Sequence, residues 1–317
     1  MTDASPSYVV FGHLIIDDLQ FPDGSHADAR LGGAGTYAAL GAALVSGERV
    51  GLVSGVGRDV SASHLTWLAS WGIDTSALIE RGRQTPRSRI AYRRDGSRSE
   101  TPLLGDEHFT SMDPTVGDLP TAWAEPRGVY FFADHDAWQW PALLEWARCR
   151  GAQVMWEISA TSCNPAAFTE MTERLRSVDI LSINLSEAQA LTGLQDPIEC
   201  ADRLRQAGVC LVTLRMGAEG ALVADRNEIV AGDAAVWEPV IDPTGAGNCH
   251  SGAFLAAWCQ TGNLRRTAAL ASAAAAMVLG HHGVPPPRSP SSQPSITRRA
   301  ARVGTRVIRP RANFPSR

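Results

Sequence analysis

The sequence predicts an α/β protein whose mostly parallel central sheet carries helices on both faces, with a small β lid beside it. Three observations support this fold class. Short apolar runs alternate with stretches of helical periodicity, which is the pattern of strand–helix–strand units. Glycine-rich turns lead into several of the helical stretches. One segment with a hairpin signal interrupts the alternation and indicates a second, smaller sheet.

The strands expected in the central sheet are short and mostly apolar. They are Tyr8–Phe11, Val50–Val53, Val129–Phe132, Gln153–Trp156, Ile180–Ile183 and Cys210–Leu214. The helices expected between and after them are Ala34–Val45, Ala62–Trp71, stretches near 139–150, 165–176 and 197–207, a helix from Gly247, and Ala268–Leu279. Because parallel neighbours need crossover connections, we expect these helices to cover the sheet.

The segments of about 13–22 and 86–104 break this alternation. Leu14–Phe21 looks extended, and Asp95-Gly96 lies between two extended runs. Asp-Gly favours the positive φ angles of a tight hairpin turn. The two segments therefore predict a lid that closes over a pocket and excludes water. A hairpin without such a role is the alternative.

The basic residues exclude several classes of enzyme. All 29 are Arg, and the sequence contains no Lys. A P-loop NTPase and a protein kinase each need a Lys at their phosphates, and Schiff-base chemistry needs an amine. These three readings are therefore excluded.

The remaining composition is that of a cytoplasmic protein. The chain has 317 residues and a net charge of −4, and its six cysteines form no C-x-x-C pair. We interpret these cysteines as reduced thiols. The first residues show no secretory signal, and no apolar run reaches the roughly 20 residues of a membrane span. A cytoplasmic location without a membrane partner is expected.

The end of the chain differs from the rest. Residues 288–317 hold eight Arg and no Asp or Glu. Residues 285–317 are rich in Pro and Ser and show no periodic apolar pattern. This composition predicts a disordered basic tail. Such a tail could contact nucleic acid or anionic lipid. A solvated extension is favoured, so nucleic acid is not expected as a partner.

A glycine-rich stretch carries the first chemical signal. DPTGAGN, residues 242–248, precedes an apolar helical run that ends before Gly262. The helix is expected to begin near Gly247, with its free N–H groups and positive dipole end facing outward. A phosphate or a developing oxyanion fits there. A plain Gly-rich turn into a helix is the alternative.

Three further stretches add candidate groups, each with a structural alternative. GGAGTYAALGAALVSG, residues 32–47, permits close approach of a ligand to the backbone or tight helix packing. In NLSEAQALTG, Asn184 and Glu187 suit a hydrated Mg²⁺ or simply cap a helix. In VTLRMGAEGAL, a turn after a strand exposes backbone amides and Arg215 to a polyphosphate, or is only a β-turn.

In this order and spacing, from about Val9 to Gly283, these stretches resemble the ribokinase/PfkB family of carbohydrate and nucleoside kinases. The resemblance implies a ribokinase-like kinase domain over 1–284 that uses ATP and Mg²⁺, and it suggests a homodimer that meets through the lid. It also implies site residues. They are Gly245, Ala246, Gly247 and Asn248 for catalysis; Asp17, Gly32, Gly33 and Gly35 for the substrate; Thr213, Arg215, Gly217, Gly220 and Asp242 for the nucleotide; and Asn184 and Glu187 for the metal.

The sequence departs from the family's pattern at three places. Asn248 stands where the family has a catalytic Asp, and Tyr37 stands near the place of a polar sugar-binding Asn. The C-terminal strand expected after Gly283 is replaced by a Pro- and Ser-rich run. This combination looks like a divergent branch of the family, and the sequence does not identify its substrate.

Asn248 decides between two functions. Positioning and charge stabilisation account for most of phosphoryl-transfer catalysis, and an amide can orient a hydroxyl without accepting its proton. We therefore expect an ATP- and Mg²⁺-dependent kinase of a small sugar-like substrate, with Asp17 or Asp242 as another available carboxylate. The alternative is a catalytically weak or silent nucleotide- or sugar-binding protein. Asn248→Asp would add a base, so turnover is expected to rise, by up to ~10²-fold or more if proton transfer limits the rate.

Overall fold

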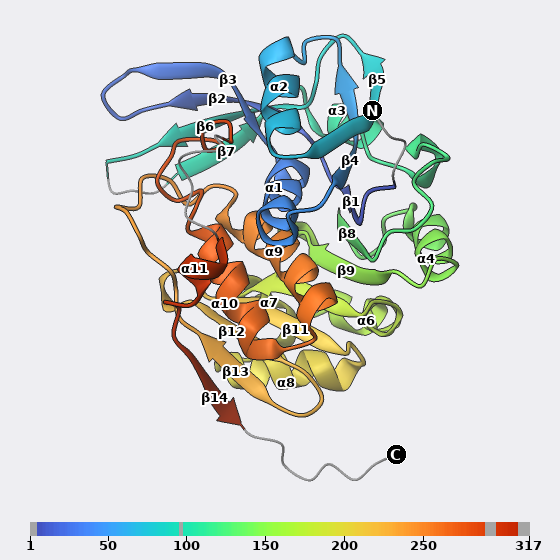
Figure 1. Cartoon of the computed structure of the whole chain (residues 1–317), viewed down its shortest axis with the longest axis vertical. Coiled ribbons are helices and arrows are strands. Elements are labelled where there is room, and N and C mark those ends of the chain that lie inside the picture. The colour runs from blue at the N-terminus through green and yellow to red at the C-terminus, as the bar shows by residue number, and fades with distance from the viewer. Residues whose placement is uncertain (1–4, 95–97, 289–295, 310–317) are drawn as a thin grey trace.

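The computed structural model describes residues 5–94, 98–288 and 296–309, and it places them around two sheets (Figure 1). The expected α/β class is confirmed: the large sheet has ten strands and the small sheet has four. No helix of the described residues is long and apolar enough to cross a membrane.

The large sheet is parallel over most of its width. In spatial order its strands are β14 (Thr305–Arg309), β13 (Ile229–Gly232), β12 (Ala221–Ala224), β11 (Leu211–Arg215), β10 (Ile180–Asn184), β9 (Gln153–Ile158), β8 (Gly128–Ala133), β1 (Tyr8–Phe11), β4 (Val50–Gly57) and β5 (Ile73–Gly82). All pairs from β11 to β5 are parallel, and β11 to β14 are antiparallel.

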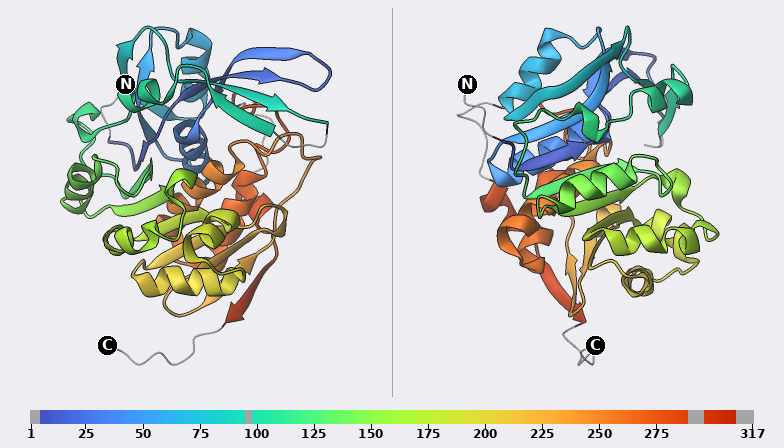
Figure 2. Two further views of the ribbon diagram at one scale, coloured as in Figure 1. Left: turned by 180° about the vertical axis from the view of Figure 1, so that it is seen from behind. Right: turned by 90° about the vertical axis from the view of Figure 1, so that its right-hand side faces the viewer.

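Helices cover both faces of this sheet, as Figure 2 shows. One layer holds α1 (Ala34–Ser46), α2 (Ala62–Ser70), α9 (Ala246–Thr261) and α10 (Leu264–Ala275). The other holds α4 (Trp140–Arg148), α5 (Ala167–Glu170), α6 (Thr172–Ser177), α7 (Leu185–Thr192) and α8 (Pro197–Ala207). Successive side chains of β1 point to opposite faces of the sheet, and all of them are apolar or aromatic. Val9 and Phe11 pack against the second layer, and Tyr8 and Val10 pack against the first.

The short helices lie in connections. They are α3 (Asp106–Ser111), α11 (Ile296–Ala300) and the 3₁₀ turns Val116–Asp118, Ala160–Ser162 and Gly217–Glu219. The single helix expected near 165–176 is divided at Met171 into α5 and α6. Strands β5, β12 and β13 were not among the expected elements.

The small sheet has the order β3-β2-β6-β7. Its strands are β2 (Ile15–Gln20), β3 (His26–Gly32), β6 (Arg87–Tyr92) and β7 (Arg98–Pro102). Strands β2, β6 and β7 fall in the two segments that the sequence singled out, whereas the largely polar β3 was not expected. The Asp95-Gly96 turn lies outside the described residues, although β6 and β7 on either side of it pair antiparallel.

The C-terminal region differs from the expected disordered tail. Helix α11 packs its Ala300 against Leu270 and Ala273 of α10, and β14 pairs antiparallel with β13 at the edge of the large sheet. A strand therefore does follow Gly283. It was missed because it lies beyond a Pro- and Ser-rich run, and because two of its five residues, Arg306 and Arg309, are charged, which obscures its apolar signal.

The topology gathers polar residues at one place. Strands β9, β10 and β11 are parallel neighbours, so their carboxyl ends meet at the same edge of the sheet. Glu157, Asn184 and Arg215 lie at or next to those ends. Helix α9 begins beside them, and the small sheet stands over the same edge (Figure 1).

Candidate active site

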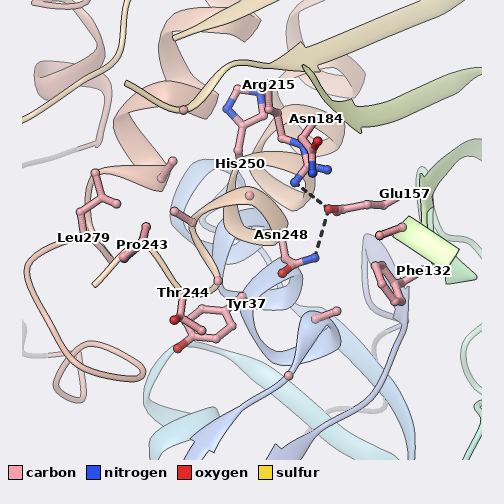
Figure 3. A pocket seen from close by; sticks show the side chains of 18 of the residues that line it. Tyr37, Phe132, Glu157, Asn184, Arg215, Pro243, Thr244, Asn248, His250 and Leu279 are labelled. Atoms are coloured by element: carbon pink, nitrogen blue, oxygen red, sulfur yellow. Dashed lines mark hydrogen bonds and ion pairs between the residues drawn. The ribbon is translucent and has the colours of Figure 1, made fainter. Parts of the chain in front are cut away.

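A cavity of about 830 Å³ opens at this edge of the large sheet. Its walls come from the carboxyl ends of β9 to β11, the beginning of α9, the small sheet, and α10 with the loop before α9. Figure 3 shows Glu157, Arg215 and Asn248 facing one another in the middle of the cavity. The cavity therefore has two ends with a polar centre between them.

The beginning of α9 forms an anion cradle. Gly245 caps the helix with a φ of 76°, and the helix runs from Ala246. A Cβ added at Gly245 would meet the Tyr37 ring at 2.3 Å, and one added at Gly247 would meet Nη1 of Arg215 at 2.2 Å. Only glycine keeps this turn open, so the first helical amides and the guanidinium share one space that suits a phosphate.

A buried carboxylate lies at the centre. Glu157 is 2% exposed, and its Oε1 lies 2.7 Å from Nη1 of Arg215 and 3.1 Å from Nδ2 of Asn248. Tyr130 donates a hydrogen bond of 2.8 Å to Oε2. Burial and the neighbouring Glu157 carboxylate raise the pKa of the Tyr130 hydroxyl, so Tyr130 remains a donor at neutral pH.

Asn184 and Glu187 are placed together as expected. They form a reciprocal cap at the beginning of α7: Oδ1 of Asn184 accepts from the Glu187 amide at 2.9 Å, and Oε2 of Glu187 accepts from the Asn184 amide at 2.9 Å. Both residues also line the cavity, with Nη2 of Arg215 at 3.9 Å from Oε2 of Glu187. The capping role is real, and it points the carboxylate toward the cradle.

His250 lies one turn into α9 and is buried. Its Nε2 is 3.0 Å from Oγ1 of Thr213, and burial, with a smaller contribution from Arg215, lowers its pKa to about 3. The ring is therefore neutral near pH 7 and is poorly suited to accept a proton. Thr213 itself is fully buried behind the cavity wall.

Asp17 lies on β2 at the other end of the cavity. It is 5% exposed, and burial together with the charges of Glu100, Asp18 and Asp242 raises its pKa to about 8. Gly32 leaves room for it, since an added Cβ there would lie 1.9 Å from Oδ2 of Asp17. The Asp17 carboxyl is thus a buried polar group in the cavity wall, which His13 and Glu100 also line.

The structure divides the expected site residues into two groups. Those that line the cavity are Asp17, Gly33, Asn184, Glu187, Arg215, Gly217, Gly220, Gly245, Ala246, Gly247 and Asn248. The others are not among the residues that line it: Gly32, Gly35, Thr213 and Asp242. Gly35 allows α1 to approach Gly12, whose carbonyl oxygen is 2.1 Å from an added Cβ.

Asp242 links two parts of the site from behind the wall. It is 1% exposed and accepts hydrogen bonds from Tyr92 of β6 and from the backbone and side chain of Thr244. Arg98 of β7 approaches it at 3.8 Å. The residue therefore stiffens the turn into α9 and connects it to the small sheet.

Sequence reasoning missed several cavity residues. Glu157 is the most important, and His13, Phe109 and Phe132 shape the end near Asp17. The signal for Glu157 was available, because a single carboxylate at the carboxyl end of an apolar parallel strand lies where α/β sheets bind ligands. The aromatic residues carried no comparable signal, since aromatic side chains in such segments usually belong to the core.

The sheet order, the helical layers and the small sheet together define a ribokinase-like α/β protein. The chain belongs to the pfkB family of carbohydrate kinases, because the family model described as "pfkB family carbohydrate kinase" matches residues 5–291. The expected family is thereby confirmed.

Similar proteins have different substrates in their names. A cytidine kinase of Thermococcus kodakarensis is 30% identical over 256 residues, which cover 79% of this chain and 87% of the relative. A 2-dehydro-3-deoxygluconokinase of Thermoproteus tenax is 28% identical over 277 residues, covering 78% and 80%. The structure of an adenosine kinase from Sinorhizobium meliloti superposes with a TM-score of 0.76 at 23% identity, covering 94% and 99%, and supports the fold.

Proposed function

We propose that this protein transfers the γ-phosphoryl group of ATP, with Mg²⁺, to a hydroxyl group of a small sugar-like substrate. The observation that carries the proposal is the position of Asn248. It lies in the first turn of α9, between the glycine cradle and Glu157, in the middle of one continuous cavity. A phosphoryl group at the cradle and a hydroxyl at the Asp17 end would meet at this residue.

The nucleotide end supports a polyphosphate. The amides at the start of α9 and the Arg215 guanidinium supply positive charge without any Lys. Small residues from the other side, Gly217, Ala218, Ala275 and Ala276, leave room for a flat ring. The remainder of the nucleotide would lie along this side, between α10 and the loop before α9.

The charge at the centre supports a divalent cation. Glu157 and Glu187 bring two carboxylates to a single Arg215, and a polyphosphate adds more negative charge. Mg²⁺ is bound in such sites by one or two carboxylates and the phosphates, with water completing its shell. Asn184 and Glu187 would hold the ion through water, and Mg²⁺ would supply charge neutralisation at the phosphates.

The acceptor end supports a hydroxylated substrate. Asp17 can accept or donate a hydrogen bond, depending on its proton, and the imidazole ring of His13 is a second polar group that lines the cavity. A ribose and a sugar acid both present neighbouring hydroxyl groups, which is the chemistry shared by the substrates in the names of the two relatives. The proposal is therefore a sugar or nucleoside kinase.

The reaction balances without a protein base. The acceptor oxygen forms a bond to the γ-phosphorus, the bond from that phosphorus to the bridging oxygen breaks, and ADP leaves. The hydroxyl proton passes to an oxygen of the transferred phosphoryl group, because the Asn248 amide cannot take it up. Asn248 orients the hydroxyl, and the α9 amides and Arg215 stabilise the developing charge.

Calorimetry combined with an ADP assay tests the proposal. MgATP is titrated into the protein, and ADP release is followed with cytidine, adenosine, fructose and 2-dehydro-3-deoxygluconate as acceptors. We expect Mg²⁺ to strengthen ATP binding and at least one acceptor to accelerate ADP release. Binding of MgATP without turnover on any acceptor would instead favour a silent nucleotide-binding protein.

A further inference from the structure

Glu157 fixes which way the Asn248 amide faces. An ionised carboxylate has acceptor atoms only, so Asn248 must present its NH₂ group to Oε1 of Glu157, 3.1 Å away. Its carbonyl oxygen Oδ1 then points away from Glu157, toward the side of the cavity with Thr244 and Tyr37 (Figure 3). An amide whose two ends differ is thus held in one of its two orientations.

Glu157 is itself held from three sides. Tyr130 of β8 donates to Oε2, while Arg215 of β11 and Asn248 of α9 both engage Oε1. The carboxylate is 2% exposed. Three donors on one buried carboxylate compensate its charge and fix its geometry, and they leave little acceptor capacity for a substrate proton. Glu157 is therefore better suited to hold its neighbours in place than to act as a general base.

We propose that Glu157 is a positioning residue for the phosphoryl transfer proposed above, on which this inference rests. It turns Oδ1 of Asn248 toward the acceptor hydroxyl and holds the Arg215 guanidinium across the cradle. The acceptor hydroxyl donates its hydrogen bond to the neutral Oδ1 of Asn248. The negative charge lies behind that amide, on the carboxylate of Glu157. The site therefore uses an amide–carboxylate pair instead of a carboxylate at position 248.

This pair reverses an expectation from the sequence. Asn248→Asp would place two carboxylates about as close as the present amide and carboxylate, at 3.1 Å. Like charges at that distance repel, and Arg215, which already faces Glu157 and Glu187, would have to compensate a third carboxylate. The substitution is therefore expected to slow the enzyme, not to accelerate it. The double variant Glu157→Gln with Asn248→Asp inverts the pair and restores one charge and one amide.

A four-member variant cycle tests the pair with an acceptor that the wild-type protein phosphorylates. We expect Glu157→Gln and Asn248→Asp each to lower kcat by about 10²-fold, with a smaller rise in KM for MgATP, because a misplaced group at the reacting centre costs about that much. The double variant should recover at least about tenfold over the slower single variant. The proposal would be overturned if the loss of kcat in the double variant equalled the product of the two single losses. It would also be overturned if Asn248→Asp were as fast as the wild-type enzyme.

Two exposed residues provide matched controls for the chemistry of the substitutions. Glu173→Gln on α6 and Asn227→Asp in the turn before β13 repeat the same changes away from the cavity. Neither should change kcat. Thermal unfolding of every variant separates loss of folding from loss of positioning.

The amide can also be observed without any acceptor. The sequence has only six Asn, so selective ¹⁵N-Asn labelling gives a simple spectrum of side-chain amides. The signal that disappears in Asn248→Ala is that of Asn248. We expect one of its two protons to resonate downfield because it is donated to a carboxylate, and we expect this shift to disappear in Glu157→Gln.

The spectrum separates this inference from the proposed function. A wild-type Asn248 signal at the position of free amides, or one that Glu157→Gln leaves unchanged, would contradict the pair. Absence of turnover in the wild-type protein would instead contradict the kinase proposal and leave the spectroscopic result standing.

Discussion

Tyr92 of β6 donates a 2.5 Å hydrogen bond to Oδ2 of Asp242, a residue 150 positions farther along the chain. The other oxygen of Asp242 accepts from the Thr244 amide and hydroxyl at 2.8 and 2.6 Å. One buried carboxylate thus connects the small sheet to the turn that opens α9. A movement of the small sheet would therefore also displace the turn that forms the anion cradle.

Tyr92→Phe should destabilise the protein by ~1–3 kcal/mol, because it leaves a buried carboxylate oxygen short of a donor. The ring itself can stay in place, stacked on Phe21 at 5.6 Å between centroids. Urea unfolding provides the measurement. The matched control is Tyr37→Phe, since the Tyr37 hydroxyl is buried without a hydrogen-bond partner among the described residues and its removal should cost little. Equal losses in both variants would contradict a special role for the Tyr92 contact.

Gly247→Ala should weaken MgATP binding more than it weakens folding. The added Cβ would lie 2.2 Å from Nη1 of Arg215, at the end of a flexible side chain, so Arg215 would move into the cradle or away from Glu157. Calorimetry should show at least about a tenfold loss of affinity if one charge-assisted phosphate contact is lost. Gly117→Ala, whose nearest neighbour would lie at an ordinary 3.5 Å, is the control. Unchanged MgATP affinity in Gly247→Ala would mean that the nucleotide does not use the cradle.

Asp17 should make the stability of the ligand-free protein depend on pH. Burial raises its pKa in the folded state from 3.8 to about 8, so the folded state binds a proton that the unfolded state lacks in this range. The contribution of the Asp17 proton to the free energy of unfolding is fully present below about pH 4. It is lost as the pH rises toward 8, at up to ~1.4 kcal/mol per pH unit. Asp17→Asn should remove this slope in denaturation curves measured from pH 4 to 8.

Glu100 gives an independent check on the same titration. Its charge is the second cause of the raised Asp17 pKa, after burial. Glu100→Gln should therefore move the end of the Asp17 slope to lower pH, while Asp17→Asn abolishes it. A wild-type curve that lacks the slope would show that Asp17 is ionised and solvated in the folded protein.

His250 should make the stability of the folded protein depend on pH in the opposite direction to Asp17. Burial lowers its pKa to about 3 in the folded state, whereas the unfolded ring takes up a proton near pH 6.5. Its contribution to stability is present above that pH and is lost as the pH falls from about 6.5 toward 3. His250→Gln, which can still pair with Thr213, should flatten this part of the profile. The pH dependence of turnover above pH 5 should be unchanged in the variant, and a changed profile would make His250 an acid–base group.

The sequence predicted the architecture because its signals were local. Each segment carries its own apolar run or helical periodicity, so six of the ten strands of the large sheet, and most of its helices, could be anticipated. The polar β3 and the Arg-rich β14 could not, since their strand character comes from the neighbours they pair with.

The site was predicted where backbone chemistry determined it. The glycines before α9, together with Asn184 and Glu187, meet at one cavity as expected. Contacts between side chains distant in the sequence could not be read from the chain. Asp242 accepts a hydrogen bond from Tyr92, 150 residues earlier in the sequence, and Glu157 accepts one from Asn248 across 91 residues.

Transfer of the labelled γ-phosphoryl group of ATP to a sugar or nucleoside tests the central claim most directly. The protein is incubated with γ-labelled ATP, Mg²⁺ and each acceptor of the panel, and the label is followed by chromatography. The account predicts Mg²⁺-dependent appearance of label in at least one acceptor, strongly reduced in Gly247→Ala. Label that remains in ATP or appears only as inorganic phosphate, with every acceptor and with folded protein that binds MgATP, would contradict it.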